Sequence, residues 1–318
     1  YQLMDTVTEE VLAKGICERI GLAGSLIDHK KGSDRIKVET PMKDHSIATE
    51  IVVKMLTDKE HGCISSMDEI EAVGHRVVHG GPYFFESCLV TPDVVDTLKK
   101  CVEFAPLHTL AHIMGIEGCT KVMPNVPQVL VFDTAFHQTM GPEAFTYPLP
   151  MNMIENDHIR RYGAHGTSHR FVSAEMNKIL GRTDTKVITC HIGNGSSISA
   201  VKNGKVVDTS MGFTPLDGVE MGTRCGSIDP AIVPFIMKKH NIGVDEIADF
   251  MNKKCGFLGV SEYSSDSRDI EDAIVGKFNE KLPSCPKTEE EKARVTKNSK
   301  LAADILSYQI KKYIGSYT

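Results

Sequence analysis

Residues 189–210, TCHIGNGSSISAVKNGKVVDTS, place a turn of small and polar residues between two apolar runs. In this turn Gly193 and Gly195 allow the backbone to approach a bulky group, because glycine has no Cβ. Successive backbone N–H groups, together with the hydroxyls of Ser196 and Ser197, can form a cradle for an anion such as a phosphate. The loop alone leaves a plain glycine-rich hairpin turn as an equal alternative, since short glycine motifs are common.

Two arginines stand in settings that favour an anionic ligand. Arg224 lies in MGFTPLDGVEMGTRCGSIDPAIVPF, a long segment without periodicity, and such segments inside compact domains are usually functional. Its guanidinium can hold an anion through two hydrogen bonds, and the alternative is a surface salt bridge. Arg76 interrupts the apolar run HRVVHGG, so its charge must be paired or must face a ligand. The alternative for Arg76 is a buried ion pair.

Three histidine pairs share the spacing i, i+4, namely His75/His79, His108/His112 and His165/His169. In HRVVH the residues are β-branched and favour a strand, where the two rings would be roughly 13 Å apart and could not share an ion. HTLAH lacks the glutamate of a zinc protease motif, and HGTSH begins at a glycine turn. The spacing therefore disfavours zinc. His165, between Gly163 and Gly166, is the best candidate for a hydrogen-bond donor to developing charge, and a loop histidine without a task is the alternative.

Composition narrows the class of protein. The 318 residues are 41% hydrophobic and 25% charged, as in a globular protein of one large or two ordinary domains. The net charge of −6 argues against a nucleic-acid surface. No apolar run is long enough for a membrane span. Nine dispersed cysteines fit reduced thiols in the cytoplasm better than a disulfide framework.

Apolar spacing and capping residues predict an α/β protein in which helices and strands alternate. In the first part we expect helices over 6–20, after Asp44, over 91–104 and over 110–122, and strands at 35–39, 71–81 and 127–137. Thr6 and Glu9 have the spacing of a capping box, and Asp44 and Thr91 are the expected N-caps of the next two helices. In the second part we expect helices over 168–180, from Asp229, and over 244–255, 266–275 and 301–314, with strands at 186–192, 197–201 and 205–209. Asn203-Gly204 predicts a type I′ turn. Residues 277–300 have the composition of a solvated insertion.

Six motifs occur in a series that resembles the acetate kinases: GHRVVHGG, APLH, VFDTAFH, RRYGAHGTSHRFV, CHIGNGSS and TPLDGVEMGTRCGSIDPAIV. The resemblance covers the whole chain. It implies two similar actin-like (ribonuclease H-like) α/β lobes with a nucleotide cleft between them, here 1–135 and 136–318. It also implies that GNGSS is the phosphate hairpin of the second lobe.

The resemblance assigns roles to residues in the matching motifs. Arg76 and Arg224 resemble the arginines that hold the carboxylate and the transferring phosphoryl, His165 the histidine that stabilises the transition state, and Asp133 the essential aspartate of FDTAFH. The implied substrate-binding residues are Arg76, Val78, Leu107, His108 and Pro215. The implied nucleotide-binding residues are His191, Ile192, Gly193, Asn194, Gly195, Asp266, Ser267 and Arg268.

The sequence also departs from the family. Ala164 stands where many members carry phenylalanine, Ser227 where aspartate is common, and Ser267 where methionine is common. Relative to the family, the sequence starts after the first lobe's phosphate hairpin and stops before the adenosine segment and a glutamate that helps to hold Mg²⁺. We therefore expect truncation at both ends and assign no metal ligand within the chain.

The implied reaction is reversible, direct in-line transfer of a phosphoryl group from ATP to acetate, which gives acetyl phosphate and ADP. An acetate carboxylate is ionised at neutral pH and needs no general base. It needs relief from charge repulsion, which two arginines, a histidine and Mg²⁺ (or Mn²⁺) supply, together with positioning. Asp133 then orients an arginine or the Mg²⁺ shell, because the carboxyl ends of strands bind ligands in α/β folds; a capping or turn aspartate is the alternative.

Two other functions compete with this interpretation. Ala164 favours a propionate kinase of the same superfamily, and a non-catalytic nucleotide- or metal-binding module is the alternative of another class. The resemblance further implies a cytoplasmic homodimer with small-molecule substrates and with no nucleic-acid or membrane partner. The choice between ATP and another phosphoryl donor stays open.

Overall fold

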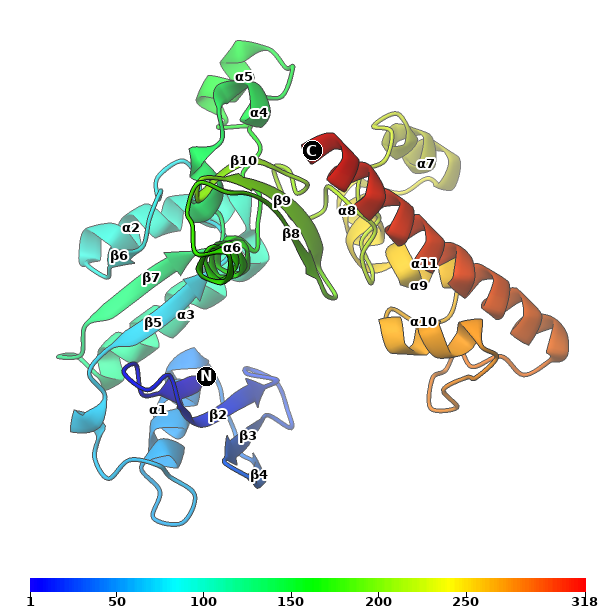
Figure 1. Ribbon diagram of the computed structural model, residues 1–318. Coiled ribbons are helices and arrows are strands. Elements are labelled where there is room, and N and C mark those ends of the chain that lie inside the picture. Colours follow the sequence, from blue (N-terminus) through cyan, green and yellow to red (C-terminus); the bar gives the residue numbers. More distant parts are fainter. The chain divides into compact units, whose positions relative to one another are not determined.

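The computed structural model describes residues 1–318, apart from the side chain of Leu107. The chain divides into two compact units, Tyr1–Val131 and Phe132–Thr318 (Figure 1, blue to green and green to red). This division falls four residues before the lobe boundary that we predicted, at the last residue of a strand. The assignment of the two lobes stays a prediction.

The first unit opens with an antiparallel sheet of four strands in chain order: β1 (Gln2–Met4), β2 (Val11–Glu18), β3 (Leu26–Lys31) and β4 (Asp34–Glu39). Ile27 of β3 is fully buried and packs with Met42 and with Ala48 of helix α1. Helix α1 (His45–Leu56) begins where Asp44 accepts a hydrogen bond from the backbone N–H of Ile47, as its position as N-cap predicted.

The helix that we expected over 6–20 is wrong. Residues 11–18 form β2, and Asp5 accepts hydrogen bonds from the backbone of Val7 and Thr8 instead of a capping box forming at Thr6. Gly15 explains the outcome, because it pairs with His29 of β3 and a Cβ there would meet the Asp28 carbonyl and the Tyr1 ring. Pairing with neighbouring strands overrides the helical spacing of the apolar residues.

A second sheet of the first unit has the strand order β5-β7-β6, with β5 (Val73–Val77), β6 (Cys88–Leu89) and β7 (Gln128–Phe132). Helix α2 (Pro92–Lys100) starts at the predicted N-cap Thr91, and α3 (Pro106–Val122) starts four residues before the position that we predicted. Helix α3 packs against α1, α2 and β5. Short 3₁₀ turns lie at Met67–Glu69 and Cys101–Phe104.

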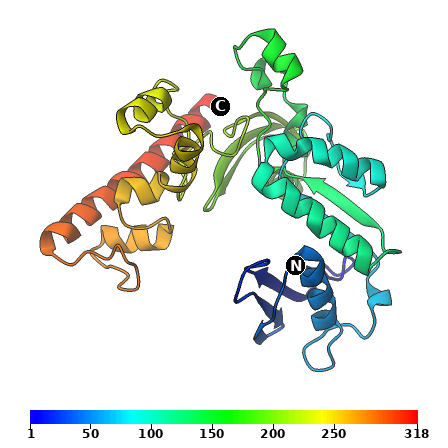
Figure 2. The same ribbon diagram turned by 180° about the vertical axis from the view of Figure 1, so that it is seen from behind.

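The second unit contains an antiparallel sheet in the order β10-β9-β8, with β8 (Lys186–Ile192), β9 (Ser196–Lys202) and β10 (Lys205–Thr209). All three strands were predicted. Asn203 (φ 52°) and Gly204 (φ 75°) both have positive φ, as a type I′ turn requires. Helix α6 (Gly166–Leu180) packs against β8 (Figures 1 and 2). Before it come the 3₁₀ turn Ala135–Thr139 and the short helices α4 (Pro142–Phe145) and α5 (Met151–Asn156).

The rest of the second unit is helical: α7 (Ile232–His240), α8 (Val244–Lys253), α9 (Gly256–Ser261), α10 (Ser267–Ile274) and α11 (Glu289–Tyr317). Asp229 accepts from the backbone of Ala231 in a turn, so α7 starts later than we predicted. Helix α9 was not predicted, since it follows α8 almost directly. Helix α10 agrees with the predicted helix over 266–275, and Asp266 is its N-cap.

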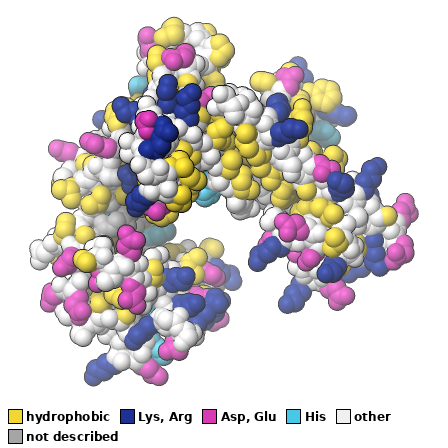
Figure 3. Space-filling model, in the orientation of Figure 1, with side chains coloured by type: hydrophobic (Ala, Val, Ile, Leu, Met, Phe, Trp, Pro, Cys, Tyr) yellow, Lys and Arg dark blue, Asp and Glu magenta, His cyan; other side chains and the backbone are white. Residues whose placement is uncertain are grey.

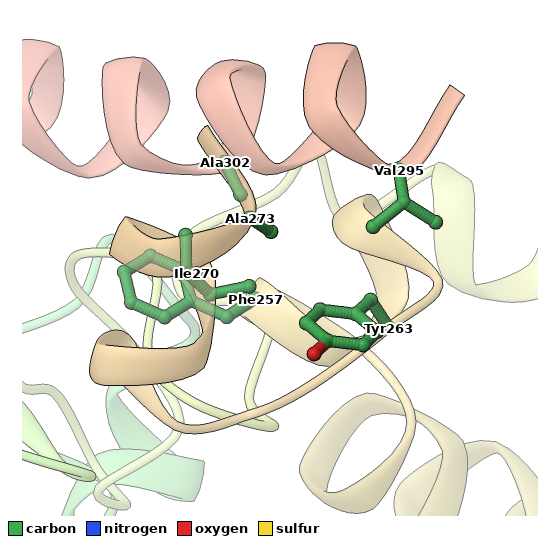
Figure 4. Packing of buried hydrophobic residues seen from close by; sticks show 6 residues of the cluster. All are labelled: Phe257, Tyr263, Ile270, Ala273, Val295 and Ala302. Carbon is green, nitrogen blue, oxygen red and sulfur yellow. The ribbon is translucent and has the colours of Figure 1, made fainter. Parts of the chain in front are cut away.

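The solvated insertion predicted at 277–300 is wrong in its second half. Residues 289–300 begin α11, where Thr288 and Glu291 form a capping box. Val295, Ser299 and Ala302 of this helix are buried, and Figure 4 shows Val295 and Ala302 facing Ile270, Ala273, Phe257 and Tyr263. The charged residues of 289–300 occupy the outer face of an amphipathic helix, which composition alone could not distinguish from a loop.

Figure 3 shows hydrophobic side chains gathered on the surface of the second unit near β8. Ile192, the last residue of β8, is 47% exposed. Charged side chains of both signs surround this area on the neighbouring surfaces. Among the described residues, none of the helices has the length and apolar character needed to cross a membrane.

Candidate functional site

The turn between β8 and β9 lies against two of the predicted catalytic side chains. A Cβ placed on Gly195 would lie 3.3 Å from Nε2 of His165 and 3.4 Å from Nη1 of Arg224. His165 and Arg224 are far apart in sequence, yet both side chains lie beside Gly195. The absence of a side chain at Gly195 therefore leaves a small cradle lined by an imidazole and a guanidinium, which suits an anion.

His165 is held in an unusual backbone conformation at the start of α6. Its φ is 60°, in the left-handed region, which costs a residue other than glycine of the order of 1–3 kcal/mol. The next residue explains the tight turn, because Gly166 donates its N–H to the carbonyl of Asp133 at 2.8 Å and has no room for a Cβ. Strain of this kind is concentrated at functional sites.

Asp133 directly follows β7, as predicted, and is 2% exposed. The hydroxyl of Thr167 lies 3.5 Å from its Oδ1. The hydrogen bond from Gly166 N–H to the backbone carbonyl of Asp133 and the Thr167 contact together place Asp133 at the N-terminal end of α6.

Arg224 is half-buried. Its Nη1 donates to the carbonyl of Pro215 at 3.1 Å and lies 3.7 Å from Sδ of Met221. Burial lowers the pKa of its guanidinium. In the described part of the chain no carboxylate lies within ion-pair distance of Arg224, so the surface salt bridge that we weighed is absent there. A half-buried guanidinium held by a carbonyl and a thioether retains donors for an anionic ligand.

A cavity of about 350 Å³ borders the same turn. The residues that line it come from the glycine turn, the loop before α9, the start of α10, and helices α9 and α11: Gly193, Asn194, Ser196, Met221, Gly222, Phe257, Ser265, Asp266, Ser267 and Leu306. Four of the predicted nucleotide-binding residues therefore meet in one cavity. The N-terminus of α10 opens into it, and such termini favour phosphate groups.

The remaining predicted nucleotide-binding residues lie at the edges of this region. His191 stacks on His165 with ring centroids 4.0 Å apart, and its Nδ1 lies 2.9 Å from Oγ of Ser168. Ile192 is exposed next to the turn. The Arg268 side chain is exposed and forms two hydrogen bonds to Asp266, which lower the pKa of that carboxyl to about 2.

The other predicted substrate-binding residues belong to the first unit. Arg76 is exposed on β5, so the buried ion pair that we weighed is wrong, and it lines a cavity of about 450 Å³ with His75 and His112. Burial lowers the pKa of His112 to about 4, and the nearby His108, Arg76 and His75 contribute. Val78 follows β5 and His108 lies in the first turn of α3. The side chain of Leu107 lies outside the described part of the chain.

Sequence reasoning gave Ser197 the wrong partner and missed other residues at this site. The Ser197 hydroxyl, which we expected in the anion cradle, is fully buried and forms hydrogen bonds with both His165 and His169. Gly222 was not predicted, and it leaves no room for a Cβ beside the Asn194 side chain. His169 is 1% exposed and packs under His165. The pair spacing of the histidines carried a signal for His169, but we tested that spacing only against zinc.

Two departures from the family acquire a structural role. Ala164 is buried and packs with Met211 and Met221, both of which are almost fully buried. The Ser227 hydroxyl donates to Asp217 at 2.5 Å and accepts from the backbone N–H of Gly218 at 3.1 Å, so it ties the two ends of the loop that carries Arg224.

The sequence pattern of the Acetokinase family matches residues 1–318. The chain belongs to this family. It is 49% identical over 320 residues to "Acetate kinase 2" of Clostridium perfringens (strain 13 / Type A) and 51% identical over 320 residues to the acetate kinase of Treponema denticola, in each case over its whole length and 76% of the relative.

Solved structures agree with this membership. The acetate kinase of Porphyromonas gingivalis superimposes with a TM-score of 0.91 at 42% identity, over 100% of this chain and 76% of that one. A propionate kinase from Francisella tularensis superimposes with a TM-score of 0.87 at 38% identity, over 99% of this chain and 76% of that one. The predicted family and its actin-like α/β fold are confirmed.

Proposed function

We propose that the chain transfers a phosphoryl group reversibly and in line between ATP and acetate, and that His165 and Arg224 stabilise the transferring group. Membership of the Acetokinase family and curated acetate kinases at about half identity support the reaction. The observation that carries the residue assignment is the cradle at Gly195, where Nε2 of His165 and Nη1 of Arg224 converge.

The cradle answers the electrostatic demand of the reaction. Acetate attacks as an anion, and the phosphoryl oxygens carry negative charge throughout, so repulsion between the two has to be reduced. Arg224 supplies a fixed positive charge in a half-buried setting, where it acts more strongly than in water. His165 supplies a second donor at the same point, and both are already positioned before the substrate arrives.

The cavity between the glycine turn and α10 fits the nucleotide. Backbone N–H groups at the start of α10 and the narrow turn at Gly193 and Asn194 suit the phosphates. We assign Asp266, Ser267 and Arg268 to this end of the nucleotide and His191 and Ile192 to its edge.

Mg²⁺ would be held mainly by phosphates and water, and none of the residues of this chain is assigned as its ligand. Asp133 offers a buried carboxylate that can orient the water shell of the ion, because Mg²⁺ usually keeps several of its waters. When bound, the ion neutralises phosphate charge. Asp133 would act on this water shell, and Mn²⁺ would take the same place.

In the first unit Arg76 is the proposed partner of the acetate carboxylate, Val78 and Leu107 are proposed to lie beside the methyl group, and His108 is a further proposed substrate-binding residue. Support comes from the positive charge of Arg76, which lines a cavity together with the imidazoles of His75 and His112. In the second unit Pro215 is the proposed substrate contact, and its carbonyl holds Arg224. We further propose that the protein is a homodimer in the cytoplasm, as the resemblance to the acetate kinases implies.

Propionate is the alternative acceptor, since a propionate kinase is a structural relative. The structure weakens its main support, because Met211 and Met221 pack around Ala164 and fill space that a missing aromatic ring would leave. Relative kcat/KM for acetate and propionate separates the two acceptors.

The test is magnesium-dependent formation of acetohydroxamate from acetate, ATP and hydroxylamine, first with the parent protein and then with Arg224→Ala. Losing a donor that acts in the transition state typically costs about 3 kcal/mol, so kcat should fall by about two orders of magnitude at an unchanged melting temperature. Arg76→Ala should also raise the KM for acetate, because the Arg76 guanidinium binds the acetate carboxylate, which is already charged in the ground state. Arg182→Ala is the control, because that exposed arginine bonds only to Asp184. A parent without activity refutes the function, and a near-normal kcat in Arg224→Ala refutes its role.

A further inference from the structure

Behind His165 runs a chain of hydrogen bonds between buried polar groups. Its Nδ1 lies 2.8 Å from Oγ of Ser197, which lies 2.7 Å from Nε2 of His169. Nδ1 of His169 lies 2.7 Å from Oγ1 of Thr189, and this hydroxyl donates to the carbonyl of Ser199 at 3.3 Å. Ser197, Ser199, His169 and Thr189 are at most 3% exposed, so water does not compete for these bonds.

The carbonyl end sets the direction of the chain. A carbonyl only accepts and a hydroxyl has one proton, so Thr189, once it donates to Ser199, must accept from His169. His169 is neutral, because burial lowers its pKa to about 2, with His137, His165 and His191 contributing. With its proton on Nδ1, its Nε2 accepts, so Ser197 donates to it. Ser197 must then accept from Nδ1 of His165. If every donor and acceptor in the chain were reversed, Thr189 would donate to His169 and could no longer donate to the Ser199 carbonyl. That arrangement contains one hydrogen bond fewer.

We propose that Ser197 is a positioning residue that keeps a proton on Nδ1 of His165, so that His165 can donate from Nε2 only in its doubly protonated form. Nε2 is the nitrogen that lies against the Gly195 cradle. Arrival of the anionic phosphoryl group is therefore coupled to uptake of one proton from solvent by His165, and departure releases it. Only this last step depends on the proposed function; the position of the proton in the empty protein does not.

The charges around His165 fit a switch between two states. Arg224 at the cradle and His191, stacked at 4.0 Å, oppose a positive charge on the ring while the site is empty. His169 from α6 stays neutral beside it, with His137 behind at 5.7 Å from the His169 ring. The negative charge of an arriving phosphoryl group favours the imidazolium.

The direct test is NMR of the whole chain with ¹⁵N-labelled histidine near neutral pH. We expect Nδ1 of His165 to carry the proton and Nε2 to be unprotonated, and we expect saturating ADP with inorganic phosphate to protonate Nε2. In Ser197→Ala the proton should shift toward Nε2 without ligand. Ser196→Ala is the matched control, because its hydroxyl is also buried on β9 but bonds to the Gly193 carbonyl. A parent protonated at Nε2, or a tautomer equal in Ser197→Ala and Ser196→Ala, overturns the proposal.

Kinetics supply a second readout. The parent kcat should fall by about tenfold per pH unit on its alkaline side, as the imidazolium fraction falls. Ser197→Ala should lose part of this slope, because neutral His165 can then donate from Nε2, and Ser197→Thr should restore it. Should Ser197→Ala not fold, Thr189→Val removes the end of the chain and should act in the same direction. If kcat falls with pH equally steeply on the alkaline side in the parent and in a folded Ser197→Ala or Thr189→Val variant, the proposal is contradicted. If His165 has the expected tautomer but the protein has no kinase activity, the proposed function is refuted and the role of Ser197 is not.

Discussion

At the scale of single residues, Gly195 matters because of the space that it leaves. Its Cα lies where His165 and Arg224 converge, and a Cβ there would already meet both at 3.3–3.4 Å. Gly195→Val adds two further methyl groups to that space, so we expect ADP to bind about tenfold or more weakly, a loss of about 1.4 kcal/mol. Isothermal titration calorimetry measures this loss. Gly315→Val near the end of α11 is the control, since a Cβ there meets nothing within 4 Å, and equal affinities in both variants would make the turn purely structural.

Ala164 leads to a different expectation from the one its sequence position favours. The sequence predicts a larger acceptor pocket, which Ala164→Phe would narrow toward acetate. The structure buries Ala164 against Met211 and Met221, so a phenylalanine has to displace these side chains. We expect Ala164→Phe to lose about 1–3 kcal/mol of unfolding free energy through overpacking, and Ala164→Phe with Met211→Ala to recover part of it. Urea denaturation measures both variants. A fully stable Ala164→Phe whose propionate-to-acetate ratio of kcat/KM falls would restore the pocket interpretation.

Residue types predicted which residues form the site better than they predicted the buried hydrogen bonds behind it. The glycine turn, His165, Arg224 and Asp266 are singled out by motif and local chemistry, and the structure brings them together around one turn and one cavity. Ser197, His169 and Thr189 could not be linked from sequence, because their contacts depend on how α6 packs on β8 and β9. The same holds for Met211 and Ala164, whose contact closes only in the folded chain.

At the scale of elements, prediction succeeded where local signals act alone. Asn203-Gly204 fixes the turn between β9 and β10, and Asp44 and Thr91 each cap the helix that they were expected to cap. It failed where distant packing decides. Residues 11–18 become a strand because β3 pairs with them, and residues 289–300 become a helix because Val295 and Ser299 pack inward.

The loop that carries Arg224 has a buried carboxyl that should make stability depend on pH. Glu220 is 2% exposed, neither carboxyl oxygen has a hydrogen-bond partner in the described part of the chain, and burial raises its pKa from 4.5 to about 7. A raised pKa means that the folded state holds the proton more tightly than the unfolded state. Its contribution to the free energy of unfolding is therefore fully present below about pH 4.5 and is lost as the pH rises to about 7.

Glu220→Gln removes this ionisation and should gain stability over the parent as the pH rises. The gain at pH 8 relative to pH 4.5 should reach at most about 3 kcal/mol, at about 1.4 kcal/mol per pKa unit. Urea denaturation at several pH values gives the two curves. Glu271→Gln on the exposed side of α10 makes the same charge change and serves as the control. Parallel curves for Glu220→Gln and the parent would show that Glu220 ionises like an exposed carboxyl.

At the scale of the whole molecule, the two units have different tasks in the proposed reaction. All the proposed nucleotide contacts lie in the second unit, at the turn after β8 and the start of α10. The antiparallel sheet β1–β4 of the first unit contains none of the proposed site residues. Since a ligand stabilises the segments that it binds by mass action, this division of tasks should appear as a pattern of amide protection.

Hydrogen exchange followed by mass spectrometry, with and without saturating ADP, measures that pattern. We expect ADP to slow exchange in peptides that cover 191–197 and 265–268, because these segments line the cavity or border it. Peptides that cover 11–39 should exchange as in the unliganded protein, since nothing there contacts the nucleotide in the proposal. The Gly195→Val variant at the same ADP concentration is the control, and its protection should fall in proportion to its affinity. Equal protection of 11–39 and 191–197 would show that ADP acts on the first unit as strongly as on the second, which contradicts this division of tasks.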